Sequence, residues 1–138
     1  MNLFPIAVCD DLEEERVQLG RMIRTYAQQR GFSIHPRLFV SGEELLDAVR
    51  RPDSYHVLFL DIFMAGLSGV ETALRLRAAG CRGAIVFATT SLDYGVVSFD
   101  VQAADYLVKP FRQEDVDRTM DWCLEHLPDS LRVLPVYA

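Results

Sequence analysis

Four short apolar runs in the sequence are each followed directly by polar residues that could bind a metal ion or a phosphoryl group. Asp10 and Asp11 follow the first of these runs, Asp61 follows the second, and Thr89 and Lys109 follow the other two. In an open parallel sheet, ligands bind beyond the carboxyl ends of the strands. If these runs are parallel strands of one sheet, the five side chains share the edge at which ligands bind.

The charges of these residues favour a divalent cation between them. Three carboxylates close together repel one another, and the one ammonium group, that of Lys109, leaves two excess negative charges. A divalent ion would neutralise that excess, and oxygen ligands with room for water favour Mg²⁺ or Mn²⁺ over zinc. A metal ion and an ammonium group bind phosphoryl oxygens, while a carboxylate can act as the nucleophile. The set therefore predicts phosphoryl-transfer chemistry.

Lys109 is also unusual within this sequence. Of the 14 basic residues, 13 are arginine and Lys109 is the single lysine. An ammonium group is a compact point charge, which the planar guanidinium of arginine does not supply. Its place beside the aspartates indicates that this point charge is required there.

The elements that would position these residues alternate along the chain. Apolar runs predict five strands, and a helical pattern follows each of them. Strict alternation with short connections implies an α/β fold, with a parallel sheet and helices on both faces. A further strand is predicted near the end of the chain, at residues 131–137. The five strands are expected at residues 4–9, 33–40, 57–60, 84–88 and 104–108, and the helices at residues 12–31, from Ser41 onward, 68–79, 92–100 and 113–127.

Length and composition exclude several classes of protein. The chain has 138 residues, half of them hydrophobic, which suits one domain with a buried core. Its net charge of −6 argues against nucleic-acid binding by charge. No apolar run approaches the roughly 20 residues that span a bilayer, and the first residues lack the pattern of a signal peptide. The three cysteines are too few and too widely spaced for a disulfide framework or a zinc site: Cys9, Cys81 and Cys123. We therefore expect the protein to act in the reducing cytoplasm.

The order of these motifs resembles that of the response-regulator receiver domain, the CheY-like fold, over residues 4–127. The segments DIFMAGLSG, which begins at Asp61, and ADYLVKPF, which contains Lys109, are most similar to the receivers of LytTR-type transcription regulators. The resemblance implies a doubly wound (βα)5 fold whose five-stranded parallel sheet has the order 2-1-3-4-5. Residues 1–127 would form the receiver domain, and residues 128–138 a linker or the first strand of a missing output domain.

The resemblance also implies a role for each candidate residue. Asp61 is expected to accept a phosphoryl group from the phosphohistidine of a sensor histidine kinase, and Thr89 and Lys109 to bind phosphoryl oxygens. Tyr106 stands at the position of the family's switch aromatic residue, and the Lys109–Pro110 peptide is expected to be cis. The ligands of Mg²⁺ (or Mn²⁺) would be Asp11 directly, Asp10 through water, Asp61, and the backbone carbonyl of Phe63.

The function so implied is a phosphorylation-controlled switch and not an enzyme, with only weak self-catalysed phosphoryl transfer and autodephosphorylation. Phosphorylation is expected to change the surface formed by residues 92–100, 104–108 and 113–127 and to promote a homodimer. We expect this domain to bind neither nucleic acid nor a membrane, and DNA to be bound only by an absent output domain. The family usually has proline where this chain has Ala65, so we expect a more mobile loop after Asp61.

Three alternative functions fit parts of the pattern. A pseudo-receiver would use the same fold as an unphosphorylated interaction module, but the complete set of acidic, hydroxyl and lysine residues argues against it. An aspartate-nucleophile phosphatase needs its two acids two residues apart after the first strand, whereas Asp10 and Asp11 are adjacent. A flavodoxin-like FMN site would need a first loop rich in hydroxyl groups and glycine.

Other conspicuous residues are expected to be structural. Trp122 and Phe99 have the spacing of core residues, and the acidic residues 13–15 suit a solvated helix start. The histidines are expected on the surface or in loops, at His35, His56 and His126.

Overall fold

A single parallel sheet runs through the middle of the molecule. The computed structural model describes residues 4–51, 53–90, 101–128 and 131. Every neighbouring pair of strands is parallel, and their order is β2-β1-β3-β4-β5, which confirms the expected topology. The strands are β1 (Ile6–Cys9), β2 (Arg37–Phe39), β3 (Val57–Leu60), β4 (Ala84–Thr89) and β5 (Asp105–Val108).

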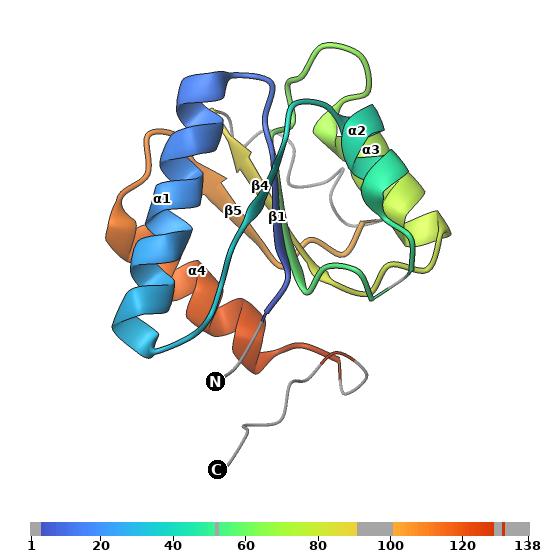
Figure 1. The fold of residues 1–138 in the computed structure, drawn as a ribbon. Coiled ribbons are helices and arrows are strands. Elements are labelled where there is room, and N and C mark those ends of the chain that lie inside the picture. The colour runs from blue at the N-terminus through green and yellow to red at the C-terminus, as the bar shows by residue number, and fades with distance from the viewer. Residues whose placement is uncertain (1–3, 52, 91–100, 129–130, 132–138) are drawn as a thin grey trace.

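Helices cover both faces of the sheet, as expected for a doubly wound fold. In Figure 1, α1 (Glu13–Arg30) and α4 (Gln113–Glu125) lie on one face, and α2 (Gly42–Ala48) and α3 (Gly69–Ala78) lie on the other. The helix expected at residues 92–100 lies outside the described residues. So does the strand expected at 131–137, apart from Leu131.

Each face of the sheet has its own apolar core, because alternate side chains of a strand point to opposite faces. Ile6 and Val8 of β1 pack in the core beneath α1 and α4, whereas Ala7 and Cys9 pack in the core beneath α2 and α3. All four residues of β3 are buried, as expected for a central parallel strand. This packing fixes β1 and β3, whose carboxyl ends carry the three candidate aspartates.

The ends of the elements follow from local chemistry. Ser41 caps α2 by accepting a hydrogen bond from the Glu44 amide, and Ser68 forms a capping box with Glu71 at the start of α3. β5 begins one residue later than its apolar run predicts, at Asp105. β1 and β2 also begin later than predicted, at Ile6 and Arg37. For β1 and β2 the preceding residue is proline, which has no N–H to donate to the sheet.

One expectation about a single residue is wrong, and another holds in part. Trp122, expected in the core, has 45% of its surface exposed and stacks on the imidazole of His126. His56, expected on the surface or in a loop, lies in the loop directly before β3, where it is buried with its ring edge-on to Phe4. Phe99 lies outside the described residues.

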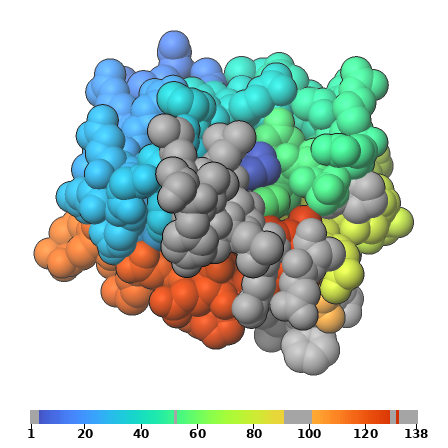
Figure 2. Space-filling model, turned by 60° about the horizontal axis from the view of Figure 1, so that its bottom comes forward, coloured from blue at the N-terminus to red at the C-terminus, as the bar shows by residue number. Residues whose placement is uncertain are grey.

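The two edges of the sheet differ in what they expose. Figure 2 turns toward the viewer the side of the molecule at which the strands begin. On this side α1, in blue to cyan, borders α4, in orange to red. The opposite edge, where the strands end, holds the candidate residues. None of the helices in the described part of the chain is long and apolar enough to cross a membrane.

Candidate functional site

The sheet holds the candidate residues at the carboxyl ends of its strands. The Asp10 amide donates to the carbonyl of Phe39 at 3.1 Å, and the Asp61 amide donates to the carbonyl of Cys9 at 3.0 Å. On the other side of the site, the Lys109 amide donates to the carbonyl of Thr89 at 2.7 Å. These bonds continue the sheet ladder one step beyond the strands, so the site residues have a rigid backbone.

Three carboxylates meet at this edge. Asp10, Asp11 and Asp61 each offer one oxygen atom, and these atoms lie within 4.8 Å of one another. The side chains of Asp10 and Asp61 are buried, whereas Asp11 is exposed and opens the cluster to water. A hard divalent cation such as Mg²⁺ prefers carboxylate oxygens and keeps several waters, so the donor set fits it.

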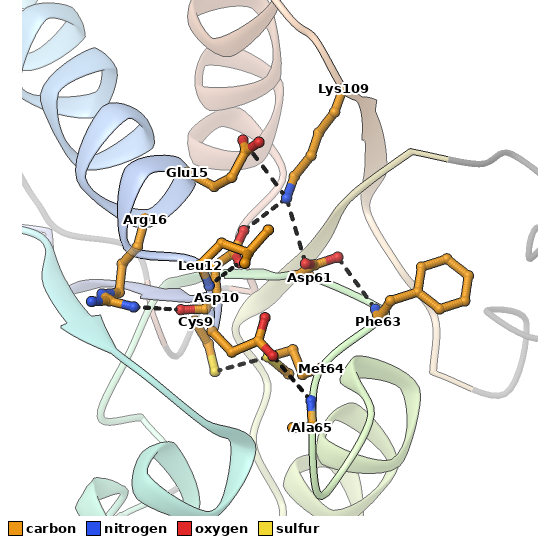
Figure 3. Close-up of polar contacts among 11 residues, drawn as sticks. Cys9, Asp10, Leu12, Glu15, Arg16, Asp61, Phe63, Met64, Ala65 and Lys109 are labelled. Atoms are coloured by element: carbon orange, nitrogen blue, oxygen red, sulfur yellow. Dashed lines mark hydrogen bonds and ion pairs between the residues drawn. The ribbon is translucent and has the colours of Figure 1, made fainter.

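The ammonium group of Lys109 bridges two of these carboxylates and reaches a third acid. Its Nζ lies 2.8 Å from Asp10 Oδ2 and 3.4 Å from Asp61 Oδ2, with Glu15 Oε2 at 3.8 Å (Figure 3). Burial lowers the pKa of Lys109, but the hydrogen bond and charge of Asp10, with the charges of Asp61 and Glu15, outweigh burial and raise it. Lys109 is therefore a permanent positive charge in the site.

Asp61 is the least well compensated of the buried acids. Its Oδ1 accepts a hydrogen bond of 3.3 Å from the Phe63 amide, and its contact with Lys109 is longer than that of Asp10. Burial raises the pKa of Asp61 above its ordinary value, although the positive charge of Lys109 opposes the rise. An incompletely paired carboxylate favours any change that brings more positive charge or hydrogen-bond donors to it.

Thr89 supplies a hydroxyl group that has no partner among the described residues. The residue is fully buried, and its Oγ1 makes no hydrogen bond within the part of the chain that the structure describes. Buried polar atoms in folded proteins are nearly always hydrogen-bonded, so each exception needs an explanation. A ligand oxygen bound between Thr89 and Lys109 would satisfy this hydroxyl.

The loop between β3 and α3 is held by acidic side chains. The amide of Ala65 donates to Asp11 Oδ2 at 3.1 Å, and the amide of Leu67 donates to Glu43 Oε1 at 3.3 Å. Gly66 has a φ of 76°, and a Cβ there would meet the Glu43 carboxylate. The loop therefore has fixed hydrogen bonds at the position where the family usually has proline and two residues after it.

The remaining expected features lie on β5 and directly after it. The Lys109–Pro110 peptide is cis, as expected. Tyr106 is half-buried, and its ring packs against Phe87 of β4 with the ring centres 5.7 Å apart.

The three cysteines are buried, and burial raises the pKa of the Cys9 thiol, just below the site, to about 12. A thiol with that pKa is no nucleophile near neutral pH.

Sequence reasoning missed residues that surround the cluster. Glu15 approaches Lys109, and Arg16 donates from Nη1 to the Asp10 carbonyl at 2.8 Å. Both stand in the first turn and a half of α1, and that spacing from the aspartates is a signal that could have found them. The amide of Ala65 is a backbone group, so no residue type could have pointed to it.

Comparisons with known proteins agree with this architecture. Residues 6–121 match the family described as the response regulator receiver domain. The sensory transduction protein LytT of Oceanobacillus iheyensis is 34% identical over 104 residues, which cover 74% of this chain and 42% of LytT. LytT of Bacillus subtilis is 30% identical over 115 residues, which cover 83% and 46% of the two chains. The crystal structure of the response regulator TrrA of Thermotoga maritima has a TM-score of 0.70 and 27% identity, covering 90% of this chain and all of TrrA.

The chain spans less than half the length of the two LytT proteins. The family match, in contrast, takes in all five strands and most of α4. This chain therefore belongs to the response regulator receiver domain family, a signalling family, and within it is similar to the receivers of LytT-type regulators.

Proposed function

We propose that this chain is the phospho-accepting receiver of a two-component system, with Asp61 as the acceptor and a sensor histidine kinase as the donor. The observation that carries the proposal is the combination of a buried, incompletely paired Asp61 carboxylate with the Lys109 ammonium and a buried Thr89 hydroxyl that has no partner among the described residues. Together these groups offer a nucleophile and two binding groups for phosphoryl oxygens.

The proposed reaction is a transfer between nitrogen and oxygen. A carboxylate oxygen of Asp61 attacks the phosphorus of a phosphohistidine, a P–O bond forms, the P–N bond breaks, and the imidazole leaves. The phosphoryl group adds negative charge, which Lys109 compensates by shifting from Asp10 toward it, while Thr89 donates its hydroxyl proton to a phosphoryl oxygen.

A divalent cation fits the same site. Asp10, Asp11 and Asp61, with the backbone carbonyl of Phe63, would hold Mg²⁺ or Mn²⁺, which supplies positive charge for the transferred group. TrrA, which has the same fold, is described in complex with Mg²⁺ and a beryllium fluoride. Without a cation, the three carboxylates have only the one ammonium group of Lys109 in the described part of the site.

The output is proposed to lie beyond the receiver. Phosphorylation would alter the surface of β5, α4 and residues 92–100, with Tyr106 as the switch residue, and favour a homodimer. LytT is called a sensory transduction protein, and this chain covers less than half of it. We propose that a DNA-binding output domain follows the receiver, that residues 128–138 lead into it, and that the protein acts in the cytoplasm.

Intact mass spectrometry tests the acceptor. The protein is incubated with a small phosphodonor and Mg²⁺, next to Asp61→Asn and to Asp53→Asn, which changes an exposed aspartate away from the site. Wild type and Asp53→Asn should each gain the mass of one phosphoryl group, and Asp61→Asn should gain none. If wild type stays unmodified by both the small donor and a phosphorylated kinase, the pseudo-receiver function stands instead.

A further inference from the structure

The loop between β3 and α3 donates three alternate backbone amides to three carboxylates. Phe63 donates to Asp61 at 3.3 Å, Ala65 donates to Asp11 at 3.1 Å, and the third pair joins Leu67 and Glu43 at 3.3 Å. The carboxylates come from the end of β3, the end of β1 and the first turn of α2. The conformation of this loop is thus tied directly to the acidic cluster.

Asp11 differs from the other two cluster aspartates in how it is held. Both oxygens of Asp10 accept hydrogen bonds, from the Leu12 amide at 2.9 Å and from Lys109 at 2.8 Å. Both oxygens of Asp61 are also engaged, by Phe63 and Lys109. Asp11 has one hydrogen bond within the described residues, from the Ala65 amide to Oδ2, and its other oxygen remains open.

The single anchor matters because Asp11 is exposed. A free carboxylate at the surface would sample several rotamers and leave the cluster for part of the time. With Oδ2 held by the loop, one carboxylate oxygen stays within 4.8 Å of those of Asp10 and Asp61 (Figure 3). Partners of this kind orient metal ligands and raise the affinity for the metal.

We infer that the backbone N–H of Ala65 is a positioning group that holds Asp11 ready for the divalent cation. The inference rests on the proposed function, since it concerns the same cation site. Proline, the residue the family usually has at this position, has no N–H to donate. This chain thus has an outer hydrogen bond to its metal ligand that a proline loop lacks.

The loop geometry allows the N–H to be removed without removing the turn. The φ of 76° at Gly66 matches the third position of a type II β-turn, and proline is favoured at the second position of such a turn, which Ala65 would then occupy. Ala65→Pro therefore deletes the donor and stiffens the loop, whereas Ala65→Gly keeps the donor and loosens the loop. Ala65→Ser keeps the donor with a side chain of similar size.

The experiment titrates Mg²⁺ alone into the unphosphorylated 138-residue chain and its three variants, with affinity taken from calorimetry and from the shift in melting temperature. Ala65→Pro should bind Mg²⁺ about 10-fold more weakly, at the lower end of the range for outer partners because Asp11 is exposed. Ala65→Ser should bind as wild type does. A further variant, Asp11→Ala, removes the acceptor, so the NMR signal of the Ala65 amide proton should differ between this variant and wild type.

The outcomes separate this inference from the proposed function. If Ala65→Pro binds Mg²⁺ as tightly as wild type or more tightly, the inference is overturned. It is also overturned if Ala65→Gly is the variant with the lowest affinity for Mg²⁺, because loop stiffness would then set the affinity. The proposed function survives either result, because phosphorylation of Asp61 is measured separately. If wild type itself binds no Mg²⁺, the metal site of the proposed function falls together with the inference.

Discussion

At the scale of the residue, Asp61 is a group whose charge the folded protein tolerates poorly without a cation. Because burial raises its pKa in the folded state, ionisation of Asp61 favours the unfolded chain. Protonated Asp61 makes its full contribution to folding stability at pH values below the pKa of Asp61 in the unfolded chain. This contribution is lost as the pH rises through the pKa of Asp61 in the folded protein. At neutral pH the ionised carboxylate therefore costs stability.

Asp61→Asn should accordingly stabilise the metal-free protein at pH 7. Its melting temperature should exceed that of wild type in a chelating buffer, and the gap should close as the pH falls and Asp61 becomes protonated. Millimolar Mg²⁺ should raise the melting temperature of wild type more than that of the variant, since the variant has lost one cluster carboxylate. A variant less stable than wild type at pH 7 without Mg²⁺ would show that Asp61 is well compensated.

Phe63 stands two residues beyond the acceptor and has half of its surface exposed. Its amide faces Asp61, while its ring extends away from the carboxylates in Figure 3. An apolar ring at the mouth of the site cannot orient a water for attack on an acyl phosphate, whereas an amide can. Phe63→Asn should therefore lose its phosphoryl group faster than wild type.

The measurement is the decay of the phosphorylated mass over time for wild type, Phe63→Asn and Phe63→Leu. The leucine variant keeps an apolar side chain without the ring, so it should decay at close to the rate of wild type. Fast decay in Phe63→Leu alone would mean that the bulk of the ring sets the lifetime. Equal decay in all three would place control of the lifetime elsewhere in the site.

At the scale of the element, the sequence predicts positions along the sheet better than positions around a helix. Asp61, Thr89 and Lys109 could be grouped because parallel strands bring their carboxyl ends to one edge, whatever packs on the faces. Trp122 could not be placed in the same way. It has the spacing of a core residue, but α4 turns it outward, and Val116 and Met120 fill the core instead.

Two kinds of contact could not be predicted from the sequence. Contacts made by the backbone, such as the Ala65 amide on Asp11, depend on loop geometry and not on side-chain type. Contacts made across the fold depend on which helices become neighbours. The hydrogen bond from Tyr26 to Asp121, which joins α1 to α4, is one of the second kind.

This α1–α4 contact should contribute measurably to stability. Tyr26 is almost fully buried, and its hydroxyl donates to Asp121 Oδ1 at 2.7 Å, while Arg30 Nη2 binds Oδ2 at 2.8 Å. Tyr26→Phe removes the hydroxyl and leaves the ring, so it should lower the free energy of unfolding by about 1–2 kcal/mol. Urea denaturation measures the loss, and a change below the error of that method would contradict the assignment.

The same contact has a pH dependence of known sign. The hydrogen bond from Arg30, followed by that from Tyr26, holds the pKa of Asp121 below its ordinary value of 3.8. The stability it contributes is present above the unfolded pKa and is lost as the pH falls through the folded pKa. Asp121→Asn should thus be less stable than wild type at pH 7, and the two should converge in acid. Asp47→Asn, at an exposed position on α2, should show no such convergence.

At the scale of the whole molecule, overall charge opposes self-association. The net charge is −6, and phosphorylation adds about one to two further negative charges. A phosphorylation-dependent dimer therefore needs local complementarity on the surface that changes. β5 lies at the edge of the sheet, and beside it Arg112 and Arg118 have side chains that are 82% and 72% exposed. Asp105 of β5 is already held within the chain by the hydroxyl of Thr119 at 2.7 Å.

Arg112 and Arg118 each contact an acid of their own chain at 3.3 Å, but both side chains are largely exposed. We expect these arginines to meet acids of a second copy. In a two-fold dimer the same patch meets itself, so one charge reversal enters the interface twice. Arg118→Glu should abolish the dimer that beryllofluoride and Mg²⁺ induce in wild type. Arg51→Glu reverses an arginine of similar exposure, 75%, away from β5 and α4, and should leave the dimer intact. Sedimentation velocity reads the outcome: if all three proteins dimerise alike, Arg118 lies outside the interface. If wild type stays monomeric at high concentration, the switch acts without dimerisation, and Asp61 remains its acceptor.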